Sequence, residues 1–70
     1  MRNTTVQAIK TKYTSLEPVL DERARRLWAA TEARAIGWGG ISQVAEATGL
    51  SRITIKAGLT ELGLPVTRTD

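Results

Sequence analysis

The stretch at residues 40–62, GISQVAEATGLSRITIKAGLTEL, constrains the fold more than any other part of this sequence. It predicts two short amphipathic helices, because apolar side chains recur at helical spacing and fall on one face of each helix. They are Ile41, Val44, Ala45 and, more weakly, Thr48 in the first helix, and Ile55, Leu59 and Leu62 in the second. Gly49 can end the first helix with a positive φ, and Ser51 is a good N-cap for the second.

The spacing within this stretch indicates a helix-turn-helix. Two helices that cross steeply after a short turn need a small residue at the crossing, a glycine in the turn and an aliphatic residue that points back. Ala45, Gly49 and Ile55 meet these needs in that order. Gly58 lies inside the second helix, where glycine costs roughly 1 kcal/mol against alanine. We therefore expect Gly58 to mark a close approach of two helices.

The absence of whole residue classes excludes most enzyme chemistry. The 70 residues contain neither Cys nor His, which removes disulfides, thiolate and imidazole metal sites and the commonest nucleophile–base pairs. The seven carboxylates show no paired arrangement of the kind that a metal or acid–base site needs. A bundle of this size also has little room for a substrate pocket. We expect no enzyme activity, no cofactor, no metal and no small-molecule substrate.

The charge and hydropathy pattern favours a soluble helical protein. Ten Lys and Arg residues against seven Asp and Glu give a net charge of +3, which suits a polyanion partner without requiring one. No apolar run approaches the length of a membrane span, and the N-terminus lacks the apolar core of a signal peptide. We expect a cytoplasmic, nucleoid-associated protein without a membrane partner. Because β-branched residues never alternate over a long run, we predict an all-α fold.

The predicted architecture is a small helical bundle of three main helices. Residues 1–15 form either a flexible basic arm or a further helix that begins near Thr4. The helical alternative has an apolar stripe of Val6, Ile9, Tyr13 and Leu16. Residues 16–63 form the helix-turn-helix domain, and residues 64–70 form a tail or linker. Gly63 should cap the last helix, with Leu64 packed back and Pro65 preventing its continuation.

The longest predicted helix opens at Glu17-Pro18, since proline suits the first helical position, and ends near Ile36 with Gly37 as its stop. Its expected buried stripe is Leu20, Ala24, Leu27, Trp28, Thr31 and Ala35. Its arginines, Arg23, Arg25, Arg26 and Arg34, should form a solvated face with i, i+4 pairs such as Glu22–Arg26. We also expect both Trp28 and Trp38 to lie in the core.

Two segments of the chain carry a resemblance to a known family. Residues 20–41 follow the pattern LDERxRRLWAAxEARAxGxGGI, and residues 44–62 follow VAxATGLSRxTIxxGLxEL. Together they resemble the N-terminal region of the ISAzo-type insertion-sequence transposases. In that family this region is a DNA-binding helix-turn-helix, and a metal-dependent DDE catalytic domain follows it. Since the 70 residues hold no such domain, the resemblance implies DNA binding and not transposition, either as part of a larger transposase or as a short independent protein.

The DNA contacts of a helix-turn-helix can be predicted from its sequence, because its second helix enters the major groove of double-stranded DNA with its N-terminal residues at the base edges. Arg52 is placed for a guanine and Ile53 for a thymine methyl, while Ala57 allows close approach. The expected base contacts are Arg52, Ile53, Lys56 and Ala57. The expected backbone contacts are Gly40, Ser42, Gln43, Ser51 and Thr60.

A different class of function remains open beside DNA binding. The chain also fits a helical protein-interaction module, such as a homodimer, or a stand-alone transcriptional regulator. Ile53 is the residue that would serve such an interface, since it is apolar on the predicted outer face of its helix.

Overall fold

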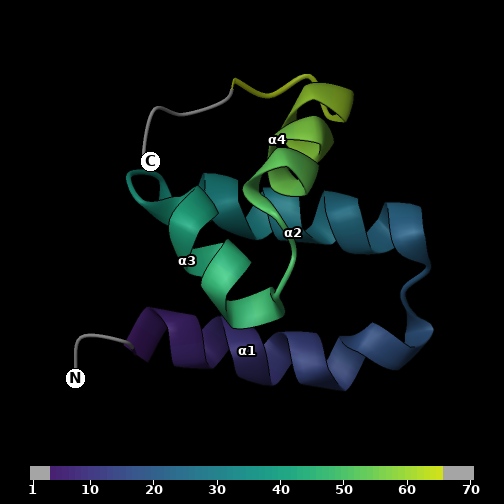
Figure 1. Ribbon diagram of the computed structural model, residues 1–70, viewed down its shortest axis with the longest axis vertical. Helices are drawn as coiled ribbons and strands as arrows, with labels where there is room; N and C mark the ends of the chain where they lie inside the picture. Colours follow the sequence, from purple (N-terminus) through teal and green to yellow (C-terminus); the bar gives the residue numbers. More distant parts are fainter. Residues whose placement is uncertain (1–3, 66–70) are drawn as a thin grey trace.

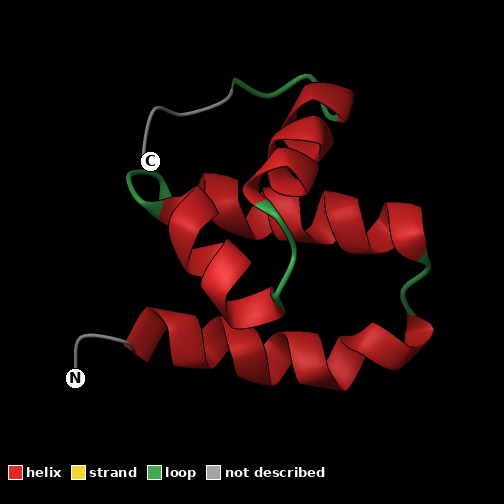
Figure 2. Ribbon diagram, viewed as in Figure 1, coloured by secondary structure: helices red, strands yellow, loops and turns green. Residues whose placement is uncertain are grey.

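The computed structural model describes residues 4–65, which fold into four α-helices around one apolar core (Figure 1). The helices are α1 (Thr4–Leu16), α2 (Glu22–Ile36), α3 (Gly40–Thr48) and α4 (Arg52–Glu61), with a 3-10 turn, η1 (Glu17–Val19), before α2. No strand occurs within residues 4–65 (Figure 2). The predicted all-α bundle is confirmed, and of the two alternatives for the N-terminal segment the helix is the correct one for residues 4–15. Residues 1–3 of that segment and residues 66–70 of the predicted tail lie outside the described residues.

The N-terminal helix α1 packs mainly against α3. Val6 and Ile9 are buried, and the ring of Tyr13 stacks on Trp28 of α2 with centroids 5.7 Å apart. Leu16, the last member of the predicted stripe, is instead 36% exposed. α1 therefore closes the lower side of the core in Figure 1, and this role explains its apolar spacing.

The start of α2 differs from the prediction. The helix begins at Glu22 and not at Glu17-Pro18, which belong to η1. Leu20 is extended between the two elements, and the carboxylate of Asp21 accepts a hydrogen bond from the Ala24 N–H at 2.7 Å. Such a cap satisfies an amide that has no partner inside the helix. The predicted end is correct, since Gly37 follows Ile36 with φ of 83°.

The buried face of α2 also differs from the predicted one. The fully covered residues are the small ones, Ala29, Ala30 and Ala33. Thr31 and Ala35 are exposed, and the other members of the predicted stripe are half-buried: Leu20, Ala24, Leu27 and Trp28. α2 packs against both α3 and α4, and close approach of two helices to a third favours alanine along the contact line.

Two glycines make these close contacts possible. A Cβ added at Gly40 would overlap the carbonyl oxygen of Ala33. One added at Gly58 would lie 2.6 Å from the carbonyl oxygen of Arg26 and 2.9 Å from the Ala30 Cβ. The expectation that Gly58 marks a close helix approach is confirmed. Gly40 makes the equivalent contact between α3 and α2.

Trp38 and Leu62 were wrongly predicted to be buried. Trp38 is 80% exposed, because it occupies the turn between α2 and α3. Leu62 is 40% exposed and is the C-cap of α4. Past Gly63, whose φ is 73°, Leu64 packs against the core instead. The Leu64 N–H donates to the Leu59 carbonyl at 2.9 Å, as in a Schellman cap.

Candidate nucleic-acid interface

The connection between α3 and α4 has the local structure that the sequence predicts. Gly49 is left-handed with φ of 80°, and its N–H donates to the Ala45 carbonyl at 2.9 Å. The Leu50 N–H donates to the Thr48 hydroxyl at 3.1 Å. The Ser51 hydroxyl accepts from the Thr54 N–H at 3.0 Å and caps α4. The turn is therefore held by hydrogen bonds on both sides of Leu50, whose side chain packs against the core.

The two faces of α4 are clearly different. Ile55, Gly58 and Leu59 are buried against the rest of the bundle. Arg52, Ile53, Ala57 and Thr60 are exposed, and Lys56 is half-buried. In Figure 1, α4 crosses over α2. The helix α1 lies on the opposite side of the bundle from α4. All four predicted base-contacting residues thus belong to the side of α4 that the core does not use.

Most cations of α2 are neutralised by carboxylates of the same chain. Arg23 and Arg26 both pair with Glu61, and Arg25 pairs with Glu17 and also donates to the Leu20 carbonyl. By contrast, Lys56 has no carboxylate within ion-pair distance among residues 4–65. Among residues 4–65, Lys56 of α4 and Arg34 at the end of α2 therefore keep a positive charge that no carboxylate of the same chain neutralises.

The pairing of Arg26 differs from the prediction and connects α2 to α4. Arg26 Nε donates to Glu61 Oε2 at 2.6 Å rather than to Glu22 one turn away. Arg23 Nε donates to the other oxygen, Glu61 Oε1, at 3.1 Å. The hydrogen bond from Arg26, helped by Arg23, lowers the pKa of the Glu61 carboxyl below its usual value of 4.5. The three side chains fix the C-terminal end of α4 on α2.

Replacing Glu61 by glutamine should change how stability depends on pH. Because the pKa of Glu61 is lower in the folded state, its contribution is complete above about pH 4.5 and is lost as pH falls further. Glu61→Gln should therefore melt at a lower temperature than the wild type at pH 7, and the difference should shrink toward pH 3. Thermal melts followed by circular dichroism across that range measure this, with Glu46→Gln as a control. If the melting temperatures of the wild type and of Glu61→Gln differed by the same amount at every pH, the lowered pKa of Glu61 in the folded state would be contradicted.

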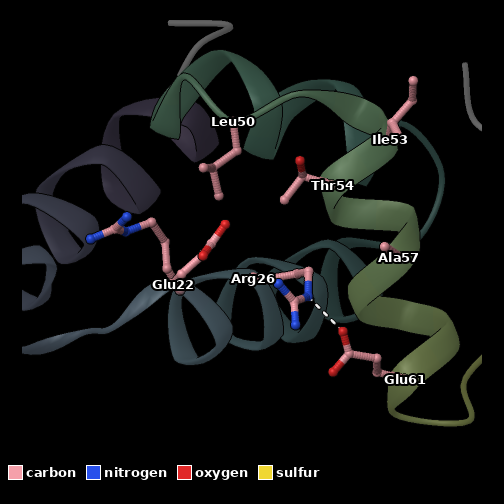
Figure 3. Close-up of a pocket in the computed structure, with 8 residues that line it drawn as sticks. Glu22, Arg26, Leu50, Ile53, Thr54, Ala57 and Glu61 are labelled. Carbon is pink, nitrogen blue, oxygen red and sulfur yellow. Dashed lines mark hydrogen bonds and ion pairs between the residues drawn. The ribbon is translucent and has the colours of Figure 1, made fainter.

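A groove of about 400 Å³ lies between the N-terminal half of α2 and the outer side of α4. It is lined by Glu22, Arg25, Arg26, Leu50, Ile53, Thr54, Ala57 and Glu61. Figure 3 shows Leu50 and Thr54 turned toward this space, whereas the side chain of Ile53 points away from it. Ile53, which is 79% exposed, therefore stands at the rim and not at the floor of the groove.

The predicted backbone-contacting residues have different environments. Gly40 is buried and its N–H donates to the Gly37 carbonyl at 2.9 Å, so we leave it out of the interface. Ser42 and Gln43 are half-buried in the first turn of α3. The hydroxyl of Ser51 is engaged in the cap of α4. Thr60 is exposed, and its hydroxyl donates to the Lys56 carbonyl at 3.1 Å.

Within residues 4–65 no group of three or more Asp, Glu, Cys or His side chains could hold a metal ion. Among the same residues no helix is both long and apolar enough to cross a membrane. No family model, curated protein or solved structure matches this sequence.

Proposed function

We propose that this chain binds double-stranded DNA with α4 in the major groove. The observation that carries the proposal is the contrast between cations: Arg23, Arg25 and Arg26 of α2 are paired with carboxylates, while Lys56 is unpaired within residues 4–65 and lies on the outer side of α4. A capped helix that follows a short glycine turn is the element that helix-turn-helix proteins insert into the groove.

The proposed contacts follow from positions on α4. Arg52 is the first helical residue after the Ser51 cap and would meet a guanine edge, and Ile53 would pack on a thymine methyl. Lys56 would bind a base or a phosphate one turn further on. Ala57 would let the helix lie close to the base edges, and Thr60 would reach the backbone. Ser42 and Gln43 of α3, together with the start of α4 at Ser51, would fix the register on the phosphates.

The resemblance of residues 20–62 to transposase N-terminal regions extends this proposal to a target. The DNA would be the end sequences of a mobile element, bound in the nucleoid of a bacterial cell. We assign DNA binding alone to these 70 residues, since strand cleavage in the resembling family belongs to a separate domain. Fluorescence anisotropy with a labelled random duplex at low salt tests the proposal, and saturable binding is the expected result.

A second candidate function rests on the exposure of Ile53. A residue with 79% of its surface exposed at the rim of a groove is suited to a protein contact, such as a homodimer. If DNA binding is the function, Ile53→Asp should leave the oligomeric state of the protein unchanged and weaken duplex binding about tenfold, because a carboxylate would face the DNA. If dimerisation is the function, Ile53→Asp should convert a dimer to a monomer in analytical ultracentrifugation. Arg52→Ala would then leave that assembly unchanged.

A further inference from the structure

Trp38 is the largest side chain that this fold leaves in solvent. It is 80% exposed, while the other tryptophan, Trp28, is half-buried and stacked on Tyr13. Trp38 lies in the connection between α2 and α3. This connection leads into the first turn of α3, which contains Ser42 and Gln43. Neither the core nor the contacts proposed for α4 account for this residue.

The backbone holds Trp38 at the corner of a fixed turn. The Gly40 N–H donates to the Gly37 carbonyl at 2.9 Å and closes a four-residue turn. Gly39, at the third position, has φ of 78° and ψ of 0°, the values of a type II turn that only glycine adopts easily. Gly40 also packs so closely against the backbone of Ala33 in α2 that a Cβ would not fit between them. Such a turn fixes the direction in which the backbone presents the Trp38 side chain to solvent.

The surroundings of this turn suit a polyanion. Between Glu32 and Glu46 the only charged residue is Arg34, which is exposed one turn before Trp38. The amide nitrogen of Gln43 lies 3.3 Å from where a Gly39 Cβ would be, so a hydrogen-bond donor folds back onto the same turn. The N-terminal end of α3 adds the partial positive charge of a helix dipole. An exposed aromatic ring with a hydrogen-bond donor and a cation within five residues of it suits contact with a deoxyribose and its neighbouring phosphates.

We propose that Trp38 packs on a deoxyribose of the DNA backbone beside the major-groove site, with Gln43 and Arg34 at the neighbouring phosphates. This inference rests on the proposed function, since it uses the DNA-facing end of α3 that a helix-turn-helix sets on the backbone. Trp38 would add affinity without reading sequence. Its contribution would not depend on salt, because the indole ring displaces no counterion.

Trp38→Ala tests this contact. Its affinity for a random duplex should fall about five- to tenfold, as for removal of one buried aromatic contact, with the slope against salt unchanged. Trp38→Phe should retain most of the affinity. Val19→Ala is the matched control, because Val19 is 78% exposed at the opposite end of α2 and should have no effect. In the wild type, bound duplex should protect one of the two tryptophans from acrylamide quenching, and in Trp38→Ala this protection should be absent.

The outcomes separate the two proposals. If Trp38→Ala binds duplex within twofold of the wild type while Lys56→Ala binds more weakly, the Trp38 contact is overturned and DNA binding through α4 stands. If the wild type binds no duplex at low salt, both proposals fail. Were Trp38→Ala to melt at a lower temperature, acrylamide quenching of the wild type would decide, and an unprotected tryptophan in the complex would overturn the contact.

Discussion

Gly40→Ala should lower the free energy of unfolding by about 3 kcal/mol, the upper end of the usual cost of overpacking a core. Gly40 does not have a positive φ, so alanine suits its backbone and would by itself favour the helix by roughly 1 kcal/mol. The added methyl group, however, would overlap the carbonyl oxygen of Ala33, a backbone atom that cannot rotate away. The first turn of α3 would have to leave α2, and the turn that holds Trp38 would move with it.

Denaturant and thermal melts measure the effect, and about 3 kcal/mol corresponds to a fall in Tm of roughly 12–24 °C in a domain of this size. Gly49→Ala is the matched control, since Gly49 has open space around it and carries only the cost of its φ of 80°. It should lower the free energy of unfolding by about 1–2 kcal/mol. A Gly40→Ala protein as stable as the wild type would contradict the close contact between α2 and α3.

The double variant Arg52→Ala/Lys56→Ala should bind duplex DNA that carries the element's end sequence about 100-fold more weakly at low salt. A bidentate guanine contact of Arg52 gives ~1–3 kcal/mol, and the phosphate interaction of Lys56 adds to it. Neither side chain belongs to the buried core. The melting temperature should therefore stay close to that of the wild type, so that the weaker binding does not reflect loss of the folded state. Fluorescence anisotropy with labelled duplexes measures it.

Lys10→Ala is the control for general charge, since Lys10 is exposed on α1 and forms no ion pair among residues 4–65. It should change affinity less than twofold if α4 carries the binding. Arg52→Ala alone should relax preference at one base pair, whereas Lys56→Ala should weaken all sequences alike. Equal effects of Lys10→Ala and of Lys56→Ala, each of which removes one positive charge, would mean that only net charge matters.

The parts of the fold that were predictable from sequence depend on local chemistry. Gly49, Gly63 and Ser51 end or cap their helices as expected, because a positive φ and a side-chain cap are properties of one or two neighbouring residues. The predicted start of α2 was wrong for a related reason. Proline at position 18 and Asp21 both signal a helix start, and the chain uses the first for η1 and the second for α2.

The features that sequence reasoning missed depend on contacts between distant residues. Arg26 and Glu61 are 35 positions apart, so the nearer Glu22 looked like the natural partner. The burial of Ala29, Ala30 and Ala33 follows from two helices packing on one face of α2, which the local hydropathy pattern does not report. Nothing in the sequence indicated the close contact of Gly40, because its φ and its distance to Ala33 are known only from the folded chain. Trp38 is exposed although tryptophan is usually buried, and only the turn explains it.

A salt titration of binding to a random duplex, for the wild type and Lys56→Ala, shows whether the outer side of α4 faces the DNA backbone. We expect log affinity to fall linearly with log salt concentration, with a slope of several units in the wild type that is smaller by roughly one unit in Lys56→Ala. A difference of that size would mean that the Lys56 ammonium neutralises one phosphate in the complex. Absence of binding at low salt, or the same slope in both proteins, would contradict a DNA-facing α4.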